Sequence, residues 1–179
     1  PYHCVDFPIG PSEGERLELK VQYVAAQLHR AIAWMEKTTG RTWDDEKFFQ
    51  AFKNEVLSRT LWAEVMHLNK AIPAPIDQKS MYPFFAITIM MPWKQECVDF
   101  HRQLLAEVRD RVASHIAAVP TERFRLIHEQ IPPWHFLRMF RVLEDYGVVA
   151  MGSHHCILIP GDFREMGDEL MPAPLPPQL

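Results

Sequence analysis

The sequence is poor in the residues that common nucleotide and metal motifs need. It has only seven glycines, and none of them forms a GxGxxG or GxxxxGK[ST] phosphate loop. It also has no GxSxG nucleophile motif. The three cysteines, Cys4, Cys97 and Cys156, lie too far apart for a disulfide framework or a close-spaced metal motif. This cysteine usage favours a reducing compartment, and we expect a cytoplasmic protein.

Positive charge and long apolar runs are also scarce. The net charge is −4, and acidic residues interrupt the most basic stretch, residues 102–111. A nucleic-acid-binding role therefore lacks its electrostatic signature. The longest apolar run, residues 83–92, is bracketed by prolines and falls short of the roughly 18 residues that a membrane span needs. With 47% apolar and 23% charged residues, the sequence is typical of a globular protein.

Most of the chain reads as helical. Apolar residues recur at the 3.6-residue period in three stretches, at about residues 12–38, 44–70 and 93–118. Residues 80–91 are expected to form a shorter, apolar and buried helix. We expect Gly40 to end the first helix and Asp44 to cap the second. Cys97 falls on the apolar face of the fourth helix, where we expect a buried thiol.

In the second helix the apolar face shifts along the sequence. Its first half places Phe48, Phe49, Phe52 and Val56 on one stripe. Beyond Arg59 a rotated face continues with Leu61, Trp62, Val65 and Met66.

Residues 121–156 predict a strand, a helix and a second strand. Residues 123–127 alternate in polarity, residues 135–146 have helical spacing, and residues 148–151 form a continuous apolar run. Gly147 lies where a helix C-terminal cap belongs. Such a βαβ unit has parallel strands and a right-handed crossover. The tail, residues 160–179, is rich in proline and is expected to be a surface loop or a truncated connection.

Two loops leave the carboxyl ends of these strands, residues 128–135 and 152–156. Open α/β sheets bind ligands outside such strand ends, and parallel strands bring both loops to one edge. We call these two loops the rim. The candidate catalytic residues on it are His128, Glu129 and His154, and the candidate substrate-binding residues are Trp134, Gly152, Ser153 and His155. A polar surface edge, with Trp134 serving only to plug the core, is the alternative.

The chemistry of the rim favours proton transfer over metal binding. Burial would tune the pKa of a carboxyl or imidazole group for proton donation, and Trp134 offers a flat face to a ligand. The run His154-His155-Cys156 offers ligands that suit zinc or iron. Adjacent strand residues point to opposite sides, however, so we assign no metal ligand.

The order of elements indicates a piece of a larger protein. The chain opens at Pro1 inside an expected strand, residues 2–6. We therefore expect residues 1–11 to end an upstream α/β domain. Residues 12–119 would form a helical linking block, and residues 120–179 would start a second, Rossmann-like α/β domain. The fold class is α/β, as part of a subunit with two such domains.

Several motifs, taken in order, resemble one family. They are YHCVDFP at residues 2–8, RAIAWMEKTTGR at 30–41, KAIPAP at 70–75 and ERFRLIHEQIPPWHFLRMFRVLEDYGVVAMGSHH at 122–155. Their order and spacing resemble the central region of the benzoyl-coenzyme A reductase / 2-hydroxyacyl-coenzyme A dehydratase family. The segments HEQIPPWH and GSHH look more like a benzoyl-CoA reductase subunit.

The resemblance implies a hetero-oligomeric iron–sulfur enzyme. Its catalytic core would carry [4Fe-4S] clusters and accept low-potential electrons from a separate ATP-hydrolysing activator, as in anaerobic aromatic degradation. The substrate would be an aromatic acyl-CoA, reduced through radical intermediates. A 2-hydroxyacyl-CoA dehydratase subunit and a non-catalytic assembly subunit are the alternatives. Cys4, Cys97 and Cys156 do not fall on the family's three cluster-binding positions, so we expect the cluster ligands to lie outside this chain, which would be inactive alone.

Overall fold

The protein has two compact parts. The structure, a computed structural model, describes residues 2–10, 14–129, 133–158 and 160–175. Residues 1–47 form unit 1 and residues 48–179 form unit 2. Helices and strands are both present, in keeping with a mixed α/β class. The domain boundaries predicted above refer to a larger protein and stay a prediction.

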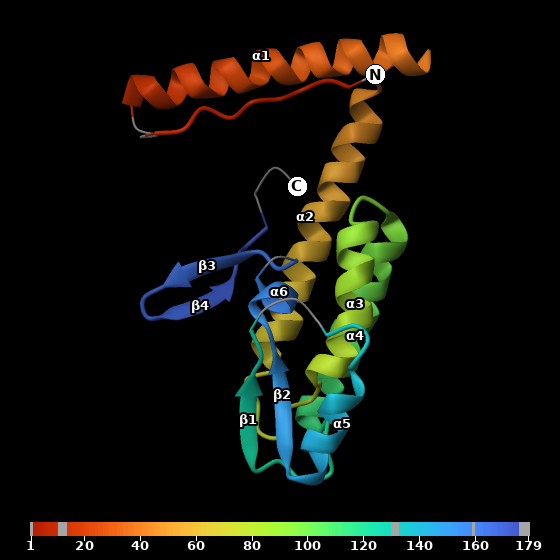
Figure 1. Ribbon diagram of the computed structural model, residues 1–179, viewed down its shortest axis with the longest axis vertical. Helices are drawn as coiled ribbons and strands as arrows, with labels where there is room; N and C mark the ends of the chain where they lie inside the picture. The colour runs from red at the N-terminus through yellow and green to blue at the C-terminus, as the bar shows by residue number, and fades with distance from the viewer. Residues whose placement is uncertain (1, 11–13, 130–132, 159, 176–179) are drawn as a thin grey trace. The chain divides into compact units, whose positions relative to one another are not determined.

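Unit 1 is one long helix with an extended segment beside it. Helix α1 (Gly14–Thr39) ends at Gly40, whose φ of +68° confirms the predicted glycine cap. Residues 2–9 run along α1 without forming the expected strand (Figure 1). The Gln27 side chain bonds the backbone of Asp6 instead, accepting from its N–H at 2.9 Å and donating to its carbonyl at 2.7 Å. A side-chain amide thus takes the place of a partner strand.

Helix α2 (Asp45–Leu68) begins at its predicted cap, where the Lys47 N–H donates to Asp44 Oδ1 at 3.0 Å. Its two apolar faces differ in how far they are buried. The rotated face of Leu61, Trp62, Val65 and Met66 is buried. The earlier stripe of Phe48, Phe49 and Phe52 remains between 47% and 64% exposed. The second half of the helix is therefore the part that builds the core of unit 2.

Helices α3 (Gln78–Met90) and α4 (Gln95–Ala113) complete the helical layer of unit 2 (Figure 1). The carboxylate of Asp77 caps α3 by accepting from the Ser80 N–H at 3.0 Å. Helix α4 stops before the predicted residue 118, and His115 turns the chain with a φ of +55°. Cys97 is fully buried, as expected. Helices α2, α3 and α4 share one hydrophobic core with α5 (Arg138–Asp145), β2 (Val148–Gly152) and α6 (His154–Ile157).

The predicted βαβ unit is confirmed. Strand β1 (Phe124–Ile127) pairs in parallel with β2, with Phe124 opposite Val148 and Ile127 opposite Gly152. A bulge between Leu126 and Ile127 shifts the register by one residue at the carboxyl end of the pair. These two strands are the whole sheet among the described residues, so the larger Rossmann-like domain stays a prediction.

The tail corrects the expectation of a surface loop. Strands β3 (Phe163–Met166) and β4 (Glu169–Pro172) form an antiparallel hairpin that turns at Gly167, where φ is +65°. The short strands lack a clear alternation of polar and apolar residues, and the prolines at the end of the chain are typical of a loop. For these two reasons the sequence did not predict the hairpin. Across the described residues, none of the helices has the length and apolar character to cross a membrane.

Candidate functional site

The two loops of the rim meet, as the sequence predicts. The backbone N–H of His128, just after β1, donates to the carbonyl of Gly152 at the end of β2, at 3.1 Å. Gly152 has a φ of +128°, and a Cβ there would lie 3.0 Å from the Ile157 side chain. The close approach therefore needs a glycine. Residues 130–132 of the first loop lie outside the described residues.

Ser153 stabilises the second loop of the rim through a buried hydrogen bond. Its side chain is fully buried, and Oγ accepts from the Cys156 N–H at 3.3 Å, which caps α6. The indole N–H of Trp62 donates to the Cys156 carbonyl at 2.9 Å. Residues 154–157 are thus a helical turn rather than the expected loop, because Ser153 caps them and Trp62 holds their end.

The titratable side chains of the rim face different surroundings. His128 is half-buried, its ring centroid lies 6.0 Å from that of Phe140, and its Nδ1 is buried without a hydrogen-bond partner. His155 is half-buried against Phe85, at a ring distance of 5.3 Å. Glu129 and His154 are exposed. The geometry makes His128 the histidine best placed to exchange a proton in a partly water-excluded setting, while the catalytic roles themselves stay predictions.

Helix α3 contributes two polar residues that the sequence did not single out. Trp134 is 49% exposed and lies 5.5 Å, ring to ring, from the fully buried Tyr82. The Gln78 amide donates to the Tyr82 hydroxyl at 2.5 Å, and the Gln78 carbonyl oxygen is buried without a partner. Within an apolar helical run, no local pattern marks these two residues. Only the packing of α3 under the rim brings Tyr82 to Trp134, with Gln78 bonded to the Tyr82 hydroxyl.

Burial keeps the groups beneath the rim neutral. Burial, together with a smaller contribution from Cys156, raises the pKa of Tyr82 to about 12, although the hydrogen bond from Gln78 opposes this shift. Burial also raises the pKa of the Cys156 thiol, an effect that the Ser153 hydrogen bond partly offsets. At neutral pH both groups keep their protons, so they can donate hydrogen bonds but are poor nucleophiles.

The described residues do not suit an iron–sulfur cluster. Cys4 is exposed, while Cys97 and Cys156 are buried. Cys97 lies 3.6 Å from the Nδ1 of His101, within the helical layer. In the part of the chain that the structure describes, no three histidine, cysteine or acidic side chains gather as a metal site. This observation also covers the run His154-His155-Cys156.

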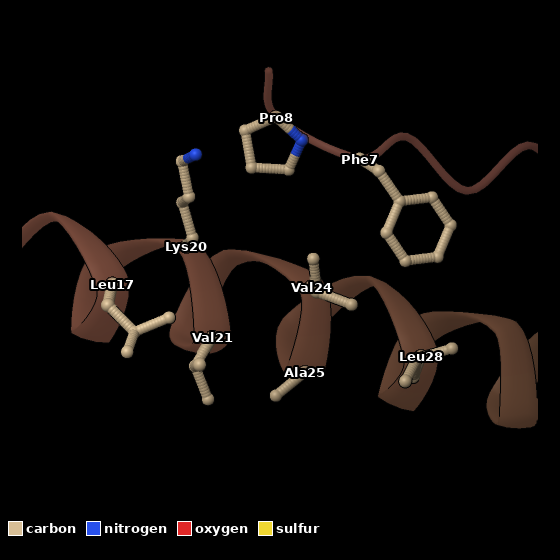
Figure 2. Close-up of a pocket in the computed structure, with 8 residues that line it drawn as sticks. All are labelled: Phe7, Pro8, Leu17, Lys20, Val21, Val24, Ala25 and Leu28. Atoms are coloured by element: carbon tan, nitrogen blue, oxygen red, sulfur yellow. The ribbon is translucent and has the colours of Figure 1, made fainter. Parts of the chain in front are cut away.

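A groove in unit 1 is large enough to hold a ligand, but its lining is almost entirely apolar. It measures about 410 Å³ and lies between the Phe7-Pro8 segment and the apolar face of α1 (Figure 2). Its charged lining residue, Lys20, extends to the Gly10 carbonyl at 2.5 Å. Its other lining residues are apolar, so we place the candidate site at the rim.

Comparison with known proteins gives one consistent answer. A family model described as 2-hydroxyglutaryl-CoA dehydratase, D-component, matches residues 1–171. The (R)-phenyllactyl-CoA dehydratase alpha subunit of Clostridium sporogenes is 26% identical over 175 residues, which cover 97% of this chain and 42% of that protein. The (R)-2-hydroxyisocaproyl-CoA dehydratase alpha subunit of Clostridioides difficile is 25% identical over 145 residues, covering 79% and 36% respectively.

A third relative belongs to the same group. The (R)-2-hydroxyglutaryl-CoA dehydratase subunit alpha of Acidaminococcus fermentans is 28% identical over 137 residues, covering 75% of this chain and 29% of that protein. The chain thus spans less than half the length of these relatives.

Proposed function

Because the chain belongs to the 2-hydroxyglutaryl-CoA dehydratase D-component family, we propose that it is part of a 2-hydroxyacyl-CoA dehydratase subunit. The observation that carries the proposal is the match of the family model to residues 1–171. Three relatives, all named as alpha subunits of such dehydratases, support it. They favour this alternative over the benzoyl-CoA reductase that the loop residues suggested. Two short loop segments are too little sequence to fix the substrate of an enzyme.

The proposed reaction is the loss of water from a 2-hydroxyacyl thioester. The hydroxyl group leaves C2, a proton leaves C3, and a double bond forms between the two carbons, with no net oxidation. Such a reaction needs groups that hold and move protons near the thioester. The half-buried imidazole of His128, at the carboxyl end of β1, is the rim group that we propose for that task.

The other rim residues would position the substrate. The exposed part of Trp134 offers an apolar surface, and the glycine at 152 lets the backbone of the two loops approach closely. His155 is a further candidate contact for the substrate, while Glu129 and His154 remain candidate proton-transfer groups. Ser153 would act through α6, because its hydroxyl already caps that helix.

The remaining machinery would come from outside this chain. We propose that a [4Fe-4S] cluster of the enzyme is held by residues other than those described here, since these form no metal site. A second catalytic subunit and a separate ATP-dependent activator would complete the enzyme. If the chain were instead a non-catalytic assembly subunit, rim variants would leave turnover unchanged.

The test uses the complete enzyme that contains this chain. We expect His128→Ala and His154→Ala, made separately, to lower the turnover of a 2-hydroxyacyl-CoA by about 100- to 10,000-fold with iron content unchanged. His29→Ala, on the exposed surface of α1, is the matched control. Benzoyl-CoA assayed in parallel separates dehydration from ring reduction. Wild-type rates in both rim variants would reject the rim as the active site.

A further inference from the structure

Strand β1 is exposed along its whole length, although it belongs to a parallel pair. All four of its residues are exposed, and the apolar ones are Phe124 at 64%, Leu126 at 39% and Ile127 at 70%. Strand β2, by contrast, is mostly buried and packs against α3 and α5. Figure 1 shows β1 on the outer side of the pair. Parallel strands are normally covered on both faces, so the exposure of β1 is unusual.

One edge of β1 has no strand beside it. Among the described residues, β1 pairs with β2 alone. The N–H groups of Phe124 and His128 donate to carbonyls on the β2 side, at 3.1 Å in both cases. Successive N–H groups of a strand point to opposite edges, so those of Arg125 and Ile127 point away from β2. We call this outward side of residues 124–127 the β1 edge. It presents backbone donors and acceptors at the spacing that a further strand needs.

The sequence of β1 does not protect this edge. Natural sheets protect their edges with outward lysines, prolines or bulges, and β1 has neither lysine nor proline. Its charged residue, Arg125, is held elsewhere, because the guanidinium donates to the Glu122 carboxylate at 2.6 Å and to the Lys70 carbonyl at 3.0 Å. The bulge next to Ile127 lies on the inner side, between β1 and β2. An apolar edge without such protection is a template for pairing with another strand.

The length of the relatives indicates where that strand comes from. This chain covers 42%, 36% and 29% of the three dehydratase alpha subunits to which it is similar. More than half of each of those subunits therefore has no counterpart in residues 1–179. Strands that follow one another in a chain usually neighbour each other in the sheet and are joined by short connections. A strand from the same subunit is therefore favoured over a strand from another protein.

We propose that the β1 edge pairs with a further β-strand from the part of the subunit that this chain does not include. Carbonyls of the added strand accept from the N–H groups of Arg125 and Ile127, and its side chains shield Phe124 and Leu126 from water. Whichever way it runs, one end of the strand lies beside His128 and brings a third loop to the rim. This inference rests on the proposed function, because it takes the chain to be part of a longer dehydratase subunit.

Hydrogen–deuterium exchange of the complete enzyme, resolved to single residues by mass spectrometry, tests the β1 edge. The N–H groups of Phe124 and His128 are the reference, because both donate to the β2 side. After correction for intrinsic rates, we expect the N–H groups of Arg125 and Ile127 to exchange within about tenfold of this reference. Faster exchange than that at Arg125 and Ile127 overturns the proposal, because it means that the edge is open to water.

A proline variant separates strand pairing from simple cover by another surface. Ile127→Pro removes the outward N–H, whereas the control Ile127→Ala removes the side chain and keeps that N–H. An unpaired edge tolerates proline, but a paired strand loses a hydrogen bond and meets the proline ring. We expect Ile127→Pro to give at least about tenfold less assembled enzyme than Ile127→Ala, measured by size-exclusion chromatography. A smaller difference overturns the pairing.

Photo-cross-linking identifies the added strand. Replacing Phe124 with p-benzoylphenylalanine keeps an aromatic ring at an exposed position of β1. We expect the cross-linked peptide to come from the same subunit but from outside residues 1–179. A cross-link to another subunit, to a second copy of the chain or only to residues 1–179 overturns the proposal, and so does the absence of any cross-link.

These measurements do not need turnover, so the two proposals fail separately. If the enzyme dehydrates a 2-hydroxyacyl-CoA but Arg125 and Ile127 exchange fast, the pairing at the β1 edge is overturned and the function stands. If Arg125 and Ile127 are protected in an enzyme that dehydrates no 2-hydroxyacyl-CoA, the function is overturned and the pairing stands.

Discussion

His101 shows how a single buried side chain can couple the fold to pH. It is fully buried in α4, with its ring between Trp62 and Phe100 in edge-on contacts. Its Nδ1 lies 2.7 Å from the Cys97 carbonyl and its Nε2 lies 2.9 Å from the Thr88 hydroxyl. A carbonyl can only accept, so Nδ1 carries the proton in the neutral ring. The Thr88 hydroxyl, which also lies 3.0 Å from the Phe84 carbonyl, has one proton to share between Nε2 and that carbonyl. Burial lowers the pKa of His101 and keeps it neutral, although the Cys97 carbonyl opposes this shift.

Stability is therefore expected to fall as the pH drops through the range of an ordinary histidine. The unfolded chain takes up a proton at His101 near pH 6.5, while the folded chain resists until a lower pH. The stabilising contribution is present above pH 6.5 and is lost between 6.5 and the lowered folded pKa. His101→Gln should reduce the pH slope of the free energy of unfolding by about one proton. Urea titrations from pH 7.5 to 5 measure that slope.

The matched comparison is His29→Gln, which changes an exposed histidine on α1. It should keep the wild-type slope. Parallel curves for the wild-type protein and His101→Gln would mean that His101 can take up a proton without unfolding.

At the scale of elements, the backbone turns from α5 into β2 at Gly147. Gly147 has a φ of +75°, which L side chains rarely adopt, and its carbonyl accepts from the N–H groups of Arg123 and Phe124 at 2.8 and 3.1 Å. A Cβ there would lie 2.9 Å from Arg123 Cγ and 3.1 Å from the Thr121 carbonyl oxygen. Gly147 thus ends α5 and also accepts the first hydrogen bonds from β1.

Gly147→Ala should lower the free energy of unfolding by more than the roughly 1–2 kcal/mol of left-handed strain alone. Gly167→Ala isolates the strain, because Gly167 has a φ of +65° with nothing within 4 Å of its Cβ position. Chemical denaturation of both variants gives the difference. Equal losses would show that Arg123 and Thr121 move aside at negligible cost.

For the molecule as a whole, the distribution of cysteines predicts that the chain does not assemble a cluster by itself. One cysteine is exposed and two are buried, and the described residues form no group of metal ligands. After anaerobic reconstitution with iron and sulfide, the isolated chain should stay colourless and silent in electron paramagnetic resonance. Visible spectra and iron content per chain provide the measurement. A reducible signal with roughly four irons per chain would show that these residues do bind a [4Fe-4S] cluster.

The sequence by itself determined the elements whose signals are local. Apolar spacing located α1 to α4, Asp44 and Gly40 marked helix ends through their capping chemistry, and the run at residues 148–151 marked β2. The parallel pairing of β1 with β2 also followed, because a strand, a helix and a strand of these lengths leave few other arrangements.

Only the tertiary structure decided which surfaces meet. The periodicity of α2 predicted two apolar faces but not that Phe48, Phe49 and Phe52 would stay exposed, since burial depends on what packs against a helix. The extended residues 2–9 and the β3–β4 hairpin were misassigned for a related reason. Strand formation requires a pairing partner that local sequence does not specify.

The candidate site likewise contains residues that the sequence predicted and residues that only the tertiary structure revealed. The rim residues His128 and Gly152 were predictable, because they follow strands whose ends must share an edge. Gln78 and Tyr82 were not, because they lie on α3, far away in the sequence, and carry no local motif. Hydrophobic packing of α3 against β2 brings them beneath the rim, and that long-range packing is what the linear pattern leaves open.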